Sequence, residues 1–431
     1  MLRPVDPRAT GRRRAGEQSA LLASSVVSTP IPTDVRPPSR SGTAPARRKD
    51  IQALRALAVL FVVVDHLWPS GLLPGGYVGV DLFFVVSGYL ITGQLARELR
   101  RTGTLDLKGF FARRARRLLP AAALVSVAAT VLVWFALPRE NWTRTALEGL
   151  GGTLYAQNWL MALSTLPEFS PDGLPTPFQH FWSLSVEEQF YLVWPVLLLL
   201  AVRRARRAGA RDRGRQRALT LVAVVTGASF LLGVVQTELS SQTAYFSTWT
   251  RVWEFGAGAL VALGVGVPRR PAVARALVAL GWATVLVCGV VYHGVEFPGV
   301  GALAPVLAAA AILAGGGTVR RTGLEPLTDR RPVQWLGDVS YSVYLWHWPL
   351  VLVLPFVLGR EPTGWDKVAL VAVVLLLAGA TRRWVELPGA RWTWARARPA
   401  RTLAVAAVVT AAPLSASLAL GFAADWAPVA A

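Results

Sequence analysis

Three ionisable side chains lie in the first long apolar segment of the chain, residues 51–67. They are Arg55, Asp65 and His66. Ionisable groups inside a membrane span mark functional sites by default. Arg55 and His66 are eleven residues apart, which is about three helical turns plus ~20°, so they share one face about 16 Å apart along the axis. A guanidinium binds anions and an imidazole takes up a proton near neutral pH. This face therefore predicts an anion-binding group at one end and a base at the other, although an interfacial structural histidine is the simpler interpretation of His66 alone.

A second group of charged residues stands where later apolar segments begin. Such groups need one another as partners inside a membrane. We expect one polar cavity, near the outer ends of the helices, that joins them to His66. The group consists of Asp81, Glu187, Glu188 and Arg251.

Several of these residues have a second interpretation. Ser185 could cap the start of a helix, with Glu188 closing a capping box, which would make the glutamate structural. Arg251 either binds a substrate or pairs with Glu254. His347 lies between two tryptophans in an apolar segment, so it is either a helix-packing group or a substrate contact.

A compact basic motif precedes the third apolar segment. It contains Arg113, Arg114, Arg116 and Arg117. Arginines three and four apart share a helical face, and guanidinium groups bind phosphate in a bidentate way. The motif predicts a clamp for a polyphosphate ligand such as a nucleotide-bearing cofactor. The alternative is a basic anchor at the cytoplasmic membrane surface.

The composition of the chain indicates that these charged residues lie in membrane-spanning segments. The chain has 431 residues, of which 53% are hydrophobic and 16% charged, and a formal charge of +20. Whole-chain disorder needs fewer apolar residues, the single Cys288 excludes a disulfide framework, and a soluble nucleic-acid binder would lack so many spanning-length apolar runs. We predict an all-α polytopic membrane protein with eleven spans: 51–67, 79–96, 118–137, 184–202, 218–236, 251–267, 273–292, 299–317, 339–358, 365–381 and 402–424.

The distribution of basic residues predicts the orientation. With the N-terminus in the cytoplasm, only Arg139, Arg144, Arg360 and Lys367 of the 45 Lys and Arg fall in external loops. Cytoplasmic loops carry the Lys/Arg excess, so we expect a cytoplasmic N-terminus and an external C-terminus. The same count places 147–163 in the outer interface rather than across the membrane. Residues 1–47 are rich in Arg, Pro and Ser and predict a disordered cytoplasmic tail.

The combined motifs resemble the acyltransferase 3 family of integral-membrane O-acyltransferases. They are Arg55 with Asp65-His66, GVDLFFVVSGYLI at 79–91, RRARRLLP at 113–120, FWSLSVEEQFY at 181–191 and SYSVYLWHWP at 340–349. The resemblance covers residues 48–385 and implies a ten-helix acyltransferase core that takes its acyl group from acyl-CoA, usually acetyl-CoA. The essential histidine of the family corresponds to His66 and its span-1 arginine to Arg55. Its R-x-x-R motif corresponds best to Arg114 and Arg117, although Arg113 and Arg116 have the same spacing.

The resemblance implies transfer to a hydroxyl of a surface glycan or glycolipid at a bacterial cytoplasmic membrane. His66 would act as general base, or as nucleophile through an acyl-imidazole, with Asp81 or Glu188 orienting its ring. Glu187, Arg251 and His347 are further substrate-binding candidates. No spacing predicts a metal site.

The C-terminal part, residues 386–431, contains the predicted linker, eleventh helix and a short outer tail. Many family members add an extracytoplasmic SGNH-type domain after such a helix, but this sequence ends at Ala431. We therefore expect that the core works alone, that a separate chain supplies an outer domain, or that this is a shortened version. The rival function is a transporter or flippase of a lipid-linked or acylated substrate, which would also bury charges across many helices.

Overall fold

The computed structural model describes residues 48–69, 71, 73–163, 175–207, 213–293, 296–319, 321–392 and 398–425. The predicted tail at 1–47 and outer tail at 426–431 lie outside these residues. Every regular element in the described part is helical, which confirms the all-α fold class. The elements of 14 or more residues are α1 (Lys49–Leu67), α2 (Gly79–Thr102), α3 (Leu107–Ala136), α6 (Phe181–Arg207), α7 (Arg213–Leu239), α9 (Thr248–Ala262), α10 (Pro271–Val291), α11 (Leu303–Gly316), α13 (Arg331–Leu358), α14 (Gly364–Thr381) and α17 (Pro399–Asp425).

Eight helices in the described residues are long and apolar enough to cross a membrane. They correspond to eight of the eleven predicted spans. The other three are α1, which has 19 residues but carries several charges, α9 with 15 residues and α11 with 14. The last two are only about 22 and 21 Å long, less than the ~30 Å hydrocarbon core of a bilayer. The chain is therefore a multi-pass membrane protein, and the crossing of these three helices stays a prediction.

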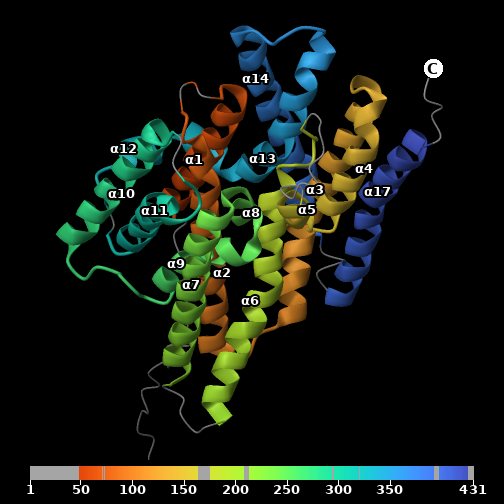
Figure 1. Cartoon of the computed structure of the whole chain (residues 1–431). Helices are drawn as coiled ribbons and strands as arrows, with labels where there is room; N and C mark the ends of the chain where they lie inside the picture. Colours follow the sequence, from red (N-terminus) through yellow and green to blue (C-terminus); the bar gives the residue numbers. More distant parts are fainter. Residues whose placement is uncertain are drawn as a thin grey trace, which may run out of the picture. The chain divides into compact units, whose positions relative to one another are not determined.

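Parallel packing of α1 and α13 forms the centre of the bundle. We call its two ends the Arg48 end and the His66 end, after residues near the two ends of α1. Helices α2 and α9 cross closely, and α7 packs against α9. Figure 1 shows α10 and α11 on one side of this centre, while α4 (Trp142–Thr153) and α17 lie on the other side.

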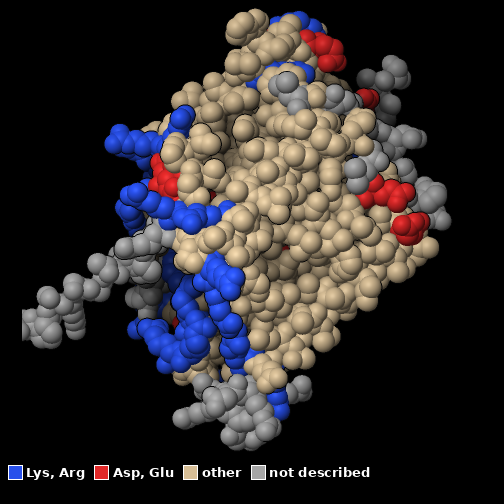
Figure 2. Space-filling view, turned by 90° about the vertical axis from the view of Figure 1, so that its left-hand side faces the viewer, with Lys and Arg blue, Asp and Glu red and all other residues tan. Residues whose placement is uncertain are grey.

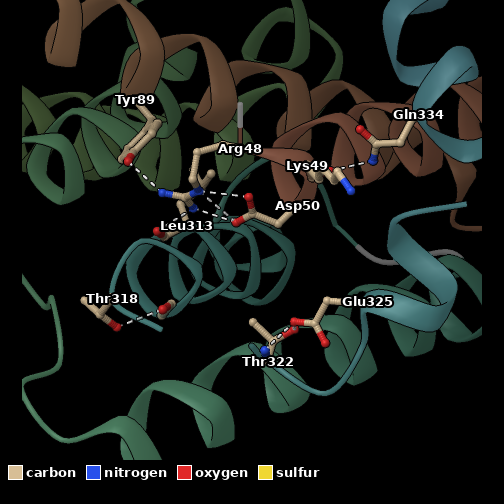
Figure 3. A network of polar contacts seen from close by, with 10 residues as sticks. Arg48, Lys49, Asp50, Tyr89, Leu313, Thr318, Thr322, Glu325 and Gln334 are labelled. Atoms are coloured by element: carbon tan, nitrogen blue, oxygen red, sulfur yellow. Dashed lines mark hydrogen bonds and ion pairs between the residues drawn. The ribbon is translucent and has the colours of Figure 1, made fainter. Parts of the chain in front are cut away.

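The Arg48 end is tied together by polar contacts from one side chain (Figure 3). Arg48 pairs with Asp50 at 2.6 Å, donates from Nη1 to the Tyr89 hydroxyl of α2 at 3.0 Å, and donates from Nη2 to the Leu313 carbonyl of α11 at 3.0 Å. Burial alone would lower the pKa of Arg48, but the Asp50 carboxylate holds it above its ordinary value. Nearby, Gln334 of α13 donates to the Lys49 carbonyl at 2.9 Å. The start of α1 is thereby fixed against α2, α11 and α13.

Short elements complete the His66 end and the connections. They are η1 (Gly76–Val78), η2 (Arg139–Asn141), α4, α5 (Gln157–Leu163), α8 (Ser241–Phe246), η4 (Val300–Ala302), α12 (Glu325–Thr328), η5 (Arg382–Glu386) and α15 (Leu387–Arg391). The segment 147–163 is divided between α4 and α5, and neither is among the helices able to cross.

Glycine allows η1 to lie directly on the end of α1. A Cβ on Gly76 would meet the Phe61 carbonyl and the Asp65 side chain. The turn that leads into α2 therefore packs against the last turns of α1, beside His66.

The surface agrees with a protein that spans a membrane. On the face in Figure 2, most atoms belong to uncharged residues, and the Lys and Arg side chains gather toward one edge. Many large apolar side chains point outward, for example Phe135 at 82% exposure and Leu376 at 74%. Lipid rather than water is the solvent that suits such a surface.

Candidate active site

The arginine cavity is a space of about 410 Å³ enclosed by α1, α2, α3, α6 and α13. This volume lies in the usual range of roughly 300–1,000 Å³ for small-molecule sites. Its charged lining residues are Arg55, Arg97, Arg113, Arg114, Arg117, Glu187 and Glu188. Five guanidinium groups against two carboxylates make the cavity suitable for an anionic ligand.

The predicted basic motif divides in two in the structure. Arg113, Arg114 and Arg117 line the cavity, whereas Arg116 points elsewhere and donates to the Thr402 hydroxyl of α17 at 2.7 Å. The helical angles explain this, because residues 113, 114 and 117 fall within an arc of about 100°, while residue 116 lies outside it. Arg55 also lines the cavity and donates to the Ser340 hydroxyl of α13 at 2.8 Å.

Arg114 is held in the cavity by contacts with α6. Its Nη2 lies 3.3 Å from Glu188 Oε1, and its guanidinium carbon lies 3.2 Å from the centre of the Tyr191 ring. Its Nε is buried without a hydrogen-bond partner among the described residues. Glu188 and Tyr191 are one turn apart on α6, so a single helix supplies both the carboxylate and the aromatic face that hold Arg114.

Glu187 occupies the middle of the same cavity. Its carboxylate accepts hydrogen bonds from the hydroxyls of Ser87 and Tyr191, which lie 2.7 Å from each other. The capping role considered for Glu188 is wrong, because α6 begins at Phe181 and Ser185 bonds back to the Phe181 carbonyl at 2.9 Å. Both glutamates belong to the arginine cavity.

A second space, the histidine cavity, lies at the His66 end. Its volume is about 400 Å³ and it is lined by Asp65, His66, Pro69, Pro74, His293 and Trp348. It shares no lining residue with the arginine cavity among the described residues. The two spaces therefore differ in their linings, one with arginines and one with histidines.

A chain of hydrogen bonds connects the linings of the two cavities. His66 Nδ1 lies 2.9 Å from His347 Nε2, and His347 Nδ1 lies 2.6 Å from the Tyr344 carbonyl. The two imidazole planes differ by 5° and their centres are 5.1 Å apart, so the rings meet edge to edge rather than face to face. Tyr344 lines the arginine cavity and His66 the histidine cavity. His347 between them is fully buried.

The prediction that Arg55 and His66 share one face of one helix is confirmed. Both lie on the continuous helix α1 and both bond to α13, through Ser340 and His347. Their levels differ by about 16 Å along the axis. The helix thus spans the distance from the arginines to the histidine cavity.

The prediction of a single outer cluster is wrong. Glu188 pairs with Arg114, His66 contacts His347, and Arg251 forms a third group with Asp81 at 3.1 Å and Glu254 at 3.0 Å. Arg251 is 0% exposed and lies 5.2–5.8 Å from the centres of four aromatic rings. Neither Asp81 nor Glu188 reaches His66. Helical spacing could not reveal these pairings, because it does not determine which helices become neighbours.

Two histidines that carried no sequence pattern also lie in this region. His293 lines the histidine cavity, and His180 donates from Nε2 to the Leu345 carbonyl at 3.1 Å, with its ring 5.7 Å from that of His347. All four histidines of the chain therefore lie in or beside the histidine cavity. Within the described residues, no group of three or more His, Cys, Asp and Glu side chains could hold a metal ion.

Comparisons with known proteins agree with the motifs. The family model described as an acyltransferase domain matches residues 48–383. The peptidoglycan O-acetyltransferase OatA of Listeria monocytogenes is 30% identical over 78% of this chain and 55% of its own length. The putative peptidoglycan O-acetyltransferase YrhL of Bacillus subtilis is 33% identical over 78% and 54%. The putative membrane-bound transacylase BcsY of Komagataeibacter xylinus is 32% identical over 80% and 83%.

The matches cover different shares of the relatives. The chain spans about half the length of the first two relatives but most of the third. No solved structure matches this chain. The family model covers more than three quarters of the sequence, including the residues that line both cavities. The chain therefore belongs to the acyltransferase 3 family of acyl-transferring enzymes.

Proposed function

We propose that this protein transfers an acyl group, acetyl by default, from acyl-CoA in the arginine cavity to a hydroxyl of a surface glycan or glycolipid in the histidine cavity. The observation that carries the proposal is the position of His66. Its ring lines the histidine cavity, at the end of a hydrogen-bonded chain that starts on the lining of the arginine cavity.

The charge of the arginine cavity supports a donor with phosphates. Arg97, Arg113 and Arg117 are its exposed basic residues, so they would hold the phosphate groups at the cavity entrance through bidentate hydrogen bonds. The polar side chains deeper in the cavity, among them Ser87, Tyr191 and Ser340, would contact the pantetheine amides. The thioester would then lie near Tyr344, next to the histidines.

The acceptor is proposed from the second cavity and from the relatives. Two relatives are named as peptidoglycan O-acetyltransferases, which supports a glycan hydroxyl. Trp348 offers the histidine cavity an aromatic ring, 4.6 Å from that of His66, against which an apolar sugar face would pack. We place the Arg48 end in the cytoplasm and the His66 end outside, so that the donor and the acceptor arrive from opposite sides.

The reaction requires one proton acceptor. His66 would take the proton of the acceptor hydroxyl as its oxygen attacks the thioester carbon. The carbon–oxygen bond forms, the carbon–sulfur bond breaks, and the imidazolium returns its proton to the leaving thiolate. The products are the acyl ester and coenzyme A. An acyl-imidazole on His66 would be the two-step version, with the same overall balance.

The test uses the full chain, purified in detergent, with [14C]acetyl-CoA and solubilised peptidoglycan. We expect label on the polymer together with release of free coenzyme A. His66→Ala should abolish both while the thermal unfolding midpoint stays near that of the wild type. Wild-type transfer by the variant would exclude His66 as base or nucleophile. Movement of a lipid-linked glycan across vesicles without transfer of label would favour the flippase instead.

A further inference from the structure

The hydrogen bonds around His347 determine which of its nitrogens carries the proton. Its Nδ1 lies 2.6 Å from the backbone carbonyl of Tyr344. A carbonyl oxygen only accepts, so Nδ1 must donate. In a neutral imidazole the other nitrogen then holds the lone pair. Nε2 of His347 is therefore an acceptor, and it faces His66.

The tautomer of His66 follows from that of His347. His66 Nδ1 lies 2.9 Å from His347 Nε2, and an acceptor there needs a donor. His66 Nδ1 must carry its ring proton, which leaves the lone pair on Nε2. We propose that His347 is a positioning residue that fixes this tautomer of His66, so that Nε2 is the base that meets the acceptor hydroxyl. The role of Nε2 as a base rests on the proposed function. The tautomer itself follows from the hydrogen bonds.

The proposal also names the direction from which the hydroxyl arrives. Nδ1 of His66 is occupied by His347, and the cavity that His66 lines is the histidine cavity. Nε2 of His66 is therefore the ring nitrogen that can accept a hydrogen bond from a ligand in the histidine cavity. A hydroxyl would approach Nε2 from the His66 end of the bundle, opposite to the arginines.

The groups around His66 and His347 explain why a histidine at position 347 suits the positioning of His66. The titratable groups that face the pair are Asp65 on α1, Tyr344 on α13, His180 before α6 and His293 after α10. Among the described residues, neither ring of the pair accepts or donates to a carboxylate. When Nε2 of His66 gains a proton, its Nδ1–H becomes a charged donor to His347. Charge-assisted hydrogen bonds are roughly twice as strong as neutral ones, so the contact strengthens when the base is protonated.

Selective 15N labelling of histidine tests the tautomer without any assay of transfer. The chain has four histidines, so the ring-nitrogen spectrum of the full protein in nanodiscs is small enough to assign with single His→Gln variants. We expect His66 to show a protonated Nδ1 and an unprotonated Nε2 at a pH where the ring is neutral. A protonated Nε2 in the wild-type protein would overturn the proposal.

Two substitutions at the same position separate positioning from packing. His347→Leu removes the acceptor, and His347→Gln offers an amide oxygen near the place of Nε2. We expect His347→Leu to lower kcat about 10- to 100-fold, part of the roughly 10²–10⁴-fold that a positioned base contributes, with little change in KM for acetyl-CoA. His347→Gln should recover most of that loss and keep the Nδ1 proton on His66.

Each outcome has a distinct meaning. Equal activity of the folded Leu and Gln variants, with an unchanged His66 spectrum in both, would exclude positioning by His347. If His347→Leu fails to fold, the wild-type spectrum still decides the tautomer. If the tautomer is as expected but the protein transfers no acyl group to any hydroxyl, the proposed function fails and the ring geometry stands.

Discussion

At the scale of single residues, three arginines of the bundle differ in exposure and in the partners that hold their side chains. Arg117 is exposed at the arginine cavity, Arg114 is held by Glu188 and Tyr191, and Arg251 is enclosed entirely. An exposed guanidinium is free to bind a ligand. An enclosed one contributes mainly to folding, because the loss of one partner leaves a buried charge uncompensated.

Arg117→Ala should weaken donor binding. A hydrogen bond to a charged group contributes about 1.5–3 kcal/mol, so we expect KM for acetyl-CoA to rise roughly 10- to 100-fold with kcat nearly unchanged. Steady-state kinetics at saturating acceptor measure both constants. The matched control is Arg275→Ala, because Arg275 is exposed on α10 and lines neither cavity. An equal KM in the two variants would argue against the phosphate contact.

Arg251→Met should destabilise the protein by about 3–5 kcal/mol, the usual cost of removing one partner from a buried ion pair. Asp81 and Glu254 would be left with like charges and no cation. We expect a clear fall in the thermal unfolding midpoint in detergent and a low yield of monodisperse protein. Adding Asp81→Asn and Glu254→Gln removes the uncompensated charge, so the triple variant should recover much of the loss. No recovery would mean that packing, not charge, is the main contribution.

The sequence identified the candidate site residues better than their partners. His66, Arg55 and the i, i+3 arginines could be predicted, because helical periodicity places residues on faces. The partner of His66 could not, because His347 is 281 positions away and periodicity does not show which faces meet. Glu188 was assigned to the wrong neighbours for the same reason, since its partner Arg114 is 74 positions away on another helix.

At the scale of elements, apolar length predicted the long helices but not their ends. The apolar run at 251–267 continues beyond α9, yet the helix ends at Ala262. Gly264 and Gly266 follow with φ of +91° and +68°, a backbone region in which glycine has no steric cost. These glycines terminate the helix without interrupting the hydrophobic pattern, so hydropathy alone could not locate its end.

The close crossing of α2 and α9 depends on glycine residues at the contact. A Cβ on Gly88 would meet the backbone of Phe255, and one on Gly258 would meet the backbone of Val85. We predict that Gly88→Ala lowers the unfolding midpoint, because the two helices must separate. Gly227→Ala on α7 is the control, since a Cβ there meets nothing within 4 Å. That control should be neutral or stabilising, by up to about 0.5–1 kcal/mol. Equal midpoints for both variants would contradict the close crossing.

At the scale of the whole molecule, the proposed orientation can be tested with one background variant. Cys288 is the only cysteine of the chain and is buried, so Cys288→Ser provides a thiol-free protein. We place Arg330→Cys at the Arg48 end and Arg360→Cys at the His66 end. A membrane-impermeant maleimide should label residue 360 in intact cells and residue 330 only after permeabilisation. The reverse pattern would invert the orientation and with it the side from which the donor enters.

The separation of the two cavities has a consequence for the cell that houses the enzyme. A gap through which water could run from one side of a bilayer to the other would let ions follow it, and each unit charge crossing 100 mV dissipates about 2.3 kcal/mol. Here Tyr344 and the fully buried His347 lie between the linings of the two cavities. An acyl group could be handed over between these linings while the electrical insulation of the membrane stays intact.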